Sequence, residues 1–217
     1  MPATRIVLVR HGEARAGVDR IIGGATGCRG ITDRGREQAQ ALRDRWAASG
    51  ELRPDAVYAS SLPRAIETAE VISDAFPQAH EVRTVDDLCE LVPGECDGMH
   101  YEDAIARYAP TVDGPDVAMS PGGETTREFD ARVRRALNEL VDSHQNESLV
   151  VVTHGGFIAA ACMYIVGAPS LAELYPFRLW PANVSLTSFV AESARPPWLL
   201  ERYNDATHVA EPTTKTG

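Results

Sequence analysis

The sequence has 217 residues, 44% hydrophobic and 24% charged, and this ordinary globular composition excludes collagen, a low-complexity chain and a coiled coil. Its 21 Lys and Arg residues against 31 Asp and Glu residues give a formal net charge of -10. That charge argues against binding nucleic acid or an anionic membrane through bulk electrostatics, so we expect neither partner. A local cluster of arginines could still bind an anionic substrate.

The apolar and cysteine patterns favour a cytoplasmic location. The longest apolar run, residues 157–166, is too short to span a bilayer, and the apolar run near the N-terminus is too short for a signal peptide. The cysteines at positions 28, 89, 96 and 162 form no CxxC pair, so we expect free thiols. The alternative is a disulfide between Cys89 and Cys96 in a secreted protein.

Strand and helix patterns alternate in the first half of the chain. Residues 5–9 (RIVLV) are apolar and β-branched, which predicts a buried strand. Thr32 or Asp33 is expected to cap a helix over 33–49, and Pro63 to begin another helix in its first turn. Further strands are expected over 56–60 and, less regularly, over 81–85.

The second half begins with an irregular stretch. Residues 91–123 are rich in glycine and proline, and we expect an insertion over a site there, with one short helix at 101–108. The remaining predicted elements are helices over 124–143 and 155–166 and strands over 148–153, 184–190 and 198–202.

This alternation predicts an α/β fold with helices on both faces of one sheet. We expect a single domain over residues 1–204 and a flexible tail over 205–217. Four histidines, at positions 80, 100, 144 and 208, fit no motif and are expected to be exposed.

Polar side chains follow three predicted strands directly. Arg10 and His11 follow the first strand, Arg64 lies just after the second, and His154 follows the strand over 148–153. Because ligands bind at the carboxyl ends of strands in such sheets, these residues should meet at one edge. Glu90, after the possible third strand, could join them.

This set of residues suits phosphoryl transfer through a phosphohistidine. Two arginines offer planar donors to phosphate oxygens, and they disfavour a protonated histidine, which keeps it nucleophilic. The helix that begins at Gly155 aims its N-terminal amides at the same edge, which adds an anion site. A carboxyl group such as that of Glu90 could protonate the departing alkoxide.

Residues 8–13 (LVRHGE) resemble the signature of the histidine phosphatase superfamily, the phosphoglycerate-mutase-like group. Five further segments match motifs of that family in the same order: 31–39, 60–69, 88–98, 121–124 and 152–156. The resemblance implies a three-layer sandwich with a central, mostly parallel sheet. It also implies a small phosphorylated metabolite as substrate, no metal or organic cofactor, and, as a family-level expectation, a homodimer through an edge strand.

The resemblance also implies a role for each matching residue. His11 is the expected nucleophile and Glu90 the proton donor. Arg10, Arg64 and His154 are expected to bind the phosphoryl group, with His154 also counted among the catalytic residues. Glu90 could instead form a structural ion pair with one of the arginines. A metal bound by His11, His154 and Glu90 is a further alternative, but two neighbouring arginines would oppose a cation.

Three departures from the family pattern lie on the substrate side. Gly17 stands where the family often has an asparagine that contacts the phosphoryl group, and Cys96 replaces an aromatic residue. Residues 22–28 (IGGATGC) replace the family's usual Thr/Ser-Gly-Trp or Gln-Gly segment, and their backbone amides could still face phosphate. These changes leave the expected reaction intact and put the substrate in doubt.

We therefore predict a phosphatase that hydrolyses a small phosphomonoester through a phosphohistidine. The first alternative is a phosphoglycerate mutase, which must retain and return the phosphoryl group. Arg107 is the only cation in residues 91–123, against six Asp or Glu residues, which makes this segment a poor lid for a bisphosphorylated cofactor. The second alternative is a non-catalytic sensor of phosphorylated ligands, which would not need the nucleophile.

Overall fold

The computed structural model describes residues 3–76, 81–108, 114–167 and 179–209. Its centre is a six-stranded sheet in the order β3-β2-β4-β1-β5-β6. The strands are β1 (Thr4–Arg10), β2 (Ala56–Ser60), β3 (Arg83–Val85), β4 (Ser148–Thr153), β5 (Leu186–Ala191) and β6 (Leu199–Asp205). Strands β3, β2, β4 and β1 are parallel, whereas β5 and β6 are antiparallel to their neighbours, so the mostly parallel sheet is confirmed.

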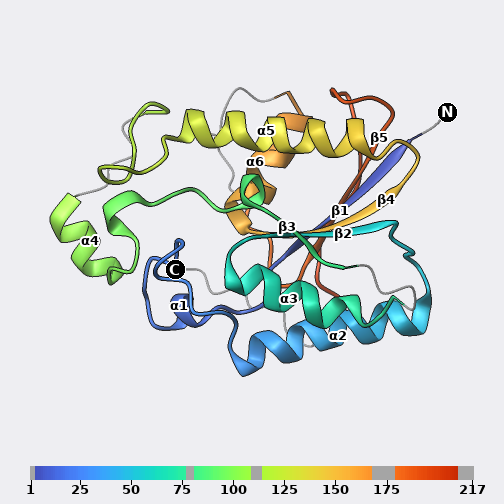
Figure 1. The fold of residues 1–217 in the computed structure, drawn as a ribbon, viewed down its shortest axis with the longest axis horizontal. Coiled ribbons are helices and arrows are strands. Elements are labelled where there is room, and N and C mark those ends of the chain that lie inside the picture. Colours follow the sequence, from blue (N-terminus) through green and yellow to red (C-terminus); the bar gives the residue numbers. More distant parts are fainter. Residues whose placement is uncertain (1–2, 77–80, 109–113, 168–178, 210–217) are drawn as a thin grey trace.

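Helices cover both faces of the sheet (Figure 1). Helices α2 (Asp33–Ser49) and α3 (Pro63–Ser73) pack on one face, and α5 (Thr126–Ser143) and α6 (Gly155–Ile165) on the other. Strand β1 serves both layers, because Ile6 and Leu8 face the α5–α6 side while Val7 and Val9 face the α2–α3 side. The predicted three-layer arrangement is therefore confirmed.

Local capping explains where these helices begin and end. The Thr32 hydroxyl accepts a hydrogen bond from the Gly35 amide at 2.9 Å, and Gly50 ends α2 in the left-handed conformation at φ 59°. Thr125 and Glu128 form a reciprocal capping box at the start of α5. Pro63 occupies the first turn of α3, as expected.

The stretch over 91–123 is mostly irregular, as predicted. It contains helix α4 (Tyr101–Tyr108) and a 3-10 turn (Gly94–Cys96), and residues 109–113 lie outside the described residues. A short helix, α1 (Arg15–Val18), follows the β1 end, and another 3-10 turn (Asp86–Leu88) follows β3. In the part of the chain that the structure describes, no helix combines the length and apolar character needed to cross a bilayer.

Three expectations about the periphery were wrong: the flexible tail does not begin at residue 205, and neither His144 nor the half-buried His208 is exposed. Asp205, where the flexible tail was expected to begin, is the last residue of β6 and accepts a hydrogen bond from Arg45 at 2.9 Å. His208 contacts the Val184 carbonyl at 3.0 Å, so residues 205–209 are attached to the body; 210–217 lie outside the described residues. His144 is buried rather than exposed, between Tyr58 at 2.8 Å and Glu147. His80 also lies outside the described residues.

Candidate active site

The predicted site residues meet at the carboxyl edge of the parallel strands. Arg10 is the last residue of β1, and His11 follows it. Arg64 lies in the first turn of α3, directly after β2, and His154 is the residue between β4 and α6. Glu90 follows the turn after β3, and it lines one cavity together with His11 and Arg64. The structure thus brings together the residues that the motifs pointed to.

The environment of His11 keeps it neutral and fixes its tautomer. Its side chain is buried, and its Nδ1 lies 2.7 Å from the carbonyl oxygen of Gly12. Because a carbonyl can only accept, Nδ1 carries the hydrogen and Nε2 keeps its lone pair. Burial lowers the pKa of His11 well below its usual 6.5, and the charges of Arg64 and Arg10 lower it further. From the sequence, the two arginines are the expected reason that His11 is neutral. In the structure, burial is the larger cause of its lowered pKa.

The glycines of two motifs allow the backbone around His11 to pack closely. A Cβ added at Gly12 would lie 2.5 Å from the Gly35 carbonyl oxygen, and one added at Gly35 would lie 2.4 Å from the Glu13 carbonyl oxygen. The start of α2 therefore packs closely against the loop that carries His11. Glu13 belongs to this packing, since its carboxylate accepts the Thr32 hydroxyl at 2.9 Å, which supports a structural role.

Arg64 and His154 contact each other directly. Arg64 Nε donates to His154 Nδ1 at 3.2 Å, and its Nη1 donates to the Gly23 carbonyl at 2.6 Å. His154 Nε2 must then carry the hydrogen, which it donates to Ser60 Oγ at 2.7 Å. Burial, followed by the charge of Arg64, lowers the pKa of His154 well below 6.5. The His11 and His154 ring centroids are 5.2 Å apart.

Arg10 has an open donor. Its Nη1 donates to the Pro181 carbonyl at 2.5 Å, and its guanidinium lies over the Trp180 ring, 5.3 Å from the centroid. Its Nε is buried and has no hydrogen-bond partner. Burial lowers the pKa of Arg10, while the charge of Glu90 acts in the opposite direction. Since buried donors are nearly always paired, this N–H is available to an anion that enters the site.

Glu90 is fixed by backbone amides. Its carboxylate accepts from the Gly156 amide at 2.9 Å and from the Leu91 amide at 3.3 Å, and among the described residues no ion pair joins it to Arg10 or Arg64. A Cβ at Gly156 would lie only 2.3 Å from Glu90 Oε1. The start of α6, which we expected to offer amides to phosphate, thus also holds Glu90. Gly155 lies beside Arg10, whose Nε would be 3.4 Å from an added Cβ.

Several supporting residues were missed by sequence reasoning. Arg132 of α5 donates to the carbonyls of Asp87, Cys89 and Glu90 at 2.8–3.3 Å, and it pairs with Glu124 at 2.6 Å. We call Arg132, its partner Glu124 and the three carbonyls that Arg132 binds the clamp. Glu124 is the last residue of the matched motif over 121–124, and this motif is the sequence feature that could have indicated the clamp.

Two more supporting contacts come from remote loops. Asn183 Nδ2 donates to the His11 carbonyl at 2.9 Å. The Asp97 carboxylate accepts from the amides of Gly24 and Gly27, both at 2.8 Å. These two amides of the glycine-rich segment therefore face Asp97, and not phosphate as we had considered.

The site opens into a cavity of about 290 Å³. His11, Arg64 and Glu90 line this cavity, and so does Gly17, where the family often has asparagine. The four cysteines are free thiols. Within the described ranges, no three His, Cys, Asp or Glu side chains are grouped closely enough to share a metal ion.

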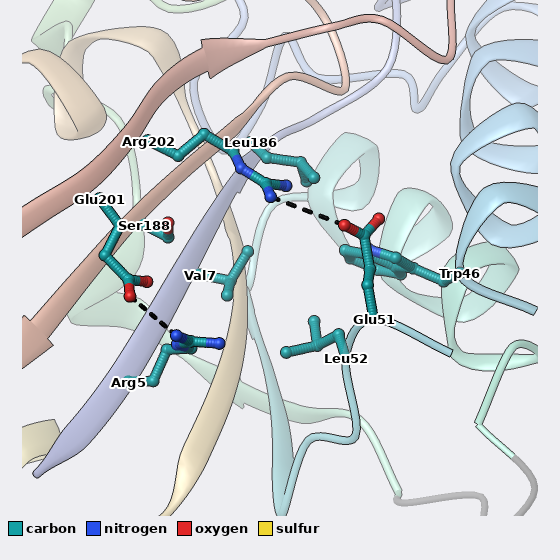
Figure 2. A pocket seen from close by; sticks show the side chains of 9 residues that line it. All are labelled: Arg5, Val7, Trp46, Glu51, Leu52, Leu186, Ser188, Glu201 and Arg202. Carbon is teal, nitrogen blue, oxygen red and sulfur yellow. Dashed lines mark hydrogen bonds and ion pairs between the residues drawn. The ribbon is translucent and has the colours of Figure 1, made fainter. Parts of the chain in front are cut away.

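A second cavity, of about 190 Å³, lies away from these residues, next to the start of β1. Figure 2 shows its lining: Arg5, Val7, Trp46, Glu51, Leu52, Leu186, Ser188, Glu201 and Arg202. Its charged side chains pair with one another, Arg5 with Glu201 at 2.8 Å and Arg202 with Glu51 at 3.6 Å. No histidine or cysteine is among its described lining residues, whereas His11, Arg64 and Glu90 line the first cavity.

The sheet, the order of its strands and the His11 site define a known class of protein. A model of the histidine phosphatase superfamily (branch 1) matches residues 6–206, and the chain belongs to this superfamily. Phosphoglycerate mutase-like protein 4 of Arabidopsis thaliana is 33% identical over 95% of this chain and 87% of its own. The metal-independent phosphoserine phosphatase of the same organism is 30% identical over 95% and 84%.

A solved structure has the same fold. The putative alpha-ribazole-5'-P phosphatase from Escherichia coli superposes with a TM-score of 0.78 at 25% identity, covering 94% of this chain and 97% of that one. The relatives named here thus include phosphatases and a mutase-like protein, all over nearly the full domain.

Proposed function

We propose that this protein is a phosphatase that hydrolyses a small phosphomonoester through a phosphohistidine on His11. The observation that carries the proposal is the open lone pair of the buried, neutral His11, beside the unpartnered Nε of Arg10 and the guanidinium of Arg64. A nucleophile and cationic donors at one cavity wall are what phosphoryl transfer needs.

The proposed reaction has two steps, transfer of the phosphoryl group to His11 and hydrolysis of the phosphohistidine. His11 Nε2 attacks phosphorus, the bond to the ester oxygen breaks, and Glu90 gives its proton to the departing alkoxide. Water then attacks the phosphohistidine, the P–N bond breaks, and Glu90 takes the proton from that water. Arg10 and Arg64 stabilise the phosphoryl charge in both steps. For His154 to donate to a phosphoryl oxygen, its Nδ1 would have to release Arg64 and carry the hydrogen, while Nε2 accepts from the Ser60 hydroxyl.

The segment over the site favours hydrolysis over mutase activity. Its one cation, Arg107, lies 3.8 Å from Glu95 and is therefore already paired with a carboxylate. A mutase must hold a doubly phosphorylated intermediate, and this acidic segment offers it little attraction. The intact nucleophile argues against a non-catalytic sensor. A cytoplasmic location and a homodimer remain predictions from the sequence.

Trapping the intermediate tests this function. The wild type, assayed on p-nitrophenyl phosphate in EDTA and stopped in alkali, should carry phosphate on His11, because alkali preserves a phosphoramidate. His11→Ala should lose both turnover and label, and peptide mapping by mass spectrometry checks the position. Three results would each contradict the proposal. The first is a label on His154 or on a serine, and the second is turnover that EDTA abolishes and zinc restores. The third is a mutase rate on 2-phosphoglycerate above the hydrolysis rate.

A further inference from the structure

The wall of the active-site cavity is almost entirely apolar apart from three polar side chains. Beyond His11, Arg64 and Glu90, every described residue that lines it is a glycine or carries an apolar side chain. The larger ones are Ile21, Ile22, Leu91, Pro93 and Met119. The three polar side chains of this lining are thus the ones that the proposed reaction uses, and the remaining lining, which is left to receive the alcohol of the substrate, is apolar.

Backbone N–H and C=O groups of this wall already form hydrogen bonds within the protein. The N–H and C=O of Ile22 bond to Met99 and Gly98, each at 2.9 Å. The Gly23 carbonyl accepts Arg64, and the Gly24 amide donates to Asp97 at 2.8 Å. Asp97 is itself turned toward this loop, since it accepts two more amides from it. A polar alcohol would therefore find these backbone groups already paired.

A wall that is apolar and whose backbone groups are already hydrogen-bonded should distinguish substrates by the cost of removing water from their alcohol group. A carboxylate or ammonium on the alcohol would lose its water and gain no partner, whereas an alkyl or aryl group gains from burial. We propose, building on the phosphatase function above, that this enzyme selects phosphate monoesters of uncharged, mainly apolar alcohols. It discriminates against esters whose alcohol carries a carboxylate or an ammonium group, such as phosphoserine and phosphoglycerate.

A matched pair of esters tests the preference in the wild type. Benzyl phosphate and 4-carboxybenzyl phosphate have leaving groups of similar shape and basicity, and they differ by one remote carboxylate. We expect kcat/KM to be on the order of 10- to 100-fold higher for benzyl phosphate. Equal values, or a preference for the carboxylate, would overturn the inference while leaving the phosphatase function in place. Failure to hydrolyse p-nitrophenyl phosphate as well would overturn both.

A variant of the wall adds a second readout. Met119→Lys places a cation in the apolar part, and it should reduce the discrimination by about tenfold through a gain on the carboxylate ester. Met119→Gln, of similar length and uncharged, is the matched control and should not produce that gain. An equal gain in both variants would show that the wall chemistry does not set the preference. Should Met119→Lys fail to fold, the wild-type pair decides alone.

Discussion

At the scale of single residues, one backbone carbonyl decides which nitrogen of His11 keeps its lone pair. The Gly12 oxygen lies 2.7 Å from Nδ1 and leaves the lone pair on Nε2, the atom that attacks phosphorus in the proposed reaction. The motif could place a histidine after the first strand, but it could not reveal the tautomer, because that depends on the path of the chain after β1. The same is true of Arg10: its Nη1 donates to the Pro181 carbonyl while its Nε has no partner, and the motif reveals neither fact.

Glu90→Gln should separate substrates by leaving group. Expelling an alkoxide without a proton is slow, and a positioned acid contributes on the order of 10²–10⁴-fold, so kcat/KM on alkyl phosphates should fall by that factor. Nitrophenolate leaves readily unprotonated, so the loss on p-nitrophenyl phosphate should be about tenfold or less. Comparing kcat/KM on the two esters isolates the first chemical step from any slowing of phosphohistidine hydrolysis.

Glu13 provides the matched control for that experiment. It is a glutamate near His11, but its carboxylate accepts from Thr32 and does not line the cavity. Glu13→Gln should therefore change kcat/KM by the same factor for both esters. Equal losses on both esters in Glu90→Gln would show that Glu90 is not the acid.

At the scale of elements, the clamp between α5 and the Glu90 loop is the contact most open to test. Arg132 and Glu124 are both largely buried, at 11% and 12% side-chain exposure, and Arg132 also holds the Glu90 carbonyl. Arg132→Met should cost roughly 3–5 kcal/mol of stability, because it leaves a buried carboxylate unpaired. It should also lower turnover of alkyl phosphates, since Glu90 loses its support. Urea unfolding and steady-state kinetics measure the two effects.

The same helix offers a control pair at its surface. Arg127 binds Asp116 through two hydrogen bonds, but both side chains are about two-thirds exposed, at 65% and 66%. Arg127→Met should leave the urea midpoint and the kinetics close to those of the wild type. If both arginine variants shifted the midpoint equally, burial would not be what makes the clamp important.

Elements with strong local signals were predictable from the sequence, and remote contacts were not. The helix over 33–49 and the strand over 148–153 have the predicted bounds, because a cap and a continuous apolar run are local features. Strand β3 is shorter than expected, and β6 longer, because pairing with a neighbour decides where an edge strand ends. His144 was misjudged for the same reason, since its partner Tyr58 lies in another element.

The candidate site divides in the same way. Its chemical groups follow strands, so the position of His11, Arg64 and His154 at one edge could be expected from the sequence. Asn183 and Trp180 reach the site from the loop before β5, and no local pattern marks either residue. The apolar wall likewise combines segments on both sides of residue 90, and only the fold reveals that they line one cavity.

At the scale of the whole molecule, three histidines make stability depend on pH. Burial lowers the pKa of His11, His154 and His208 in the folded protein, whereas the unfolded chain titrates near the ordinary value of about 6.5. As the pH falls below that value, the unfolded state takes up protons that the folded state does not. The folded protein is therefore stabilised at pH 7 and above, and it loses stability as the pH falls through 6.5 toward the lowered values.

We expect the free energy of urea unfolding to decrease from pH 7.5 to 5.5, with each such histidine contributing at most about 1.4 kcal/mol per pH unit. His208→Gln should flatten this dependence without touching the active site, because glutamine can keep a donor toward the Val184 carbonyl that His208 contacts at 3.0 Å. His100→Gln is the control, since His100 is exposed. A slope unchanged by His208→Gln, or changed equally by His100→Gln, would show that burial of His208 does not set this dependence.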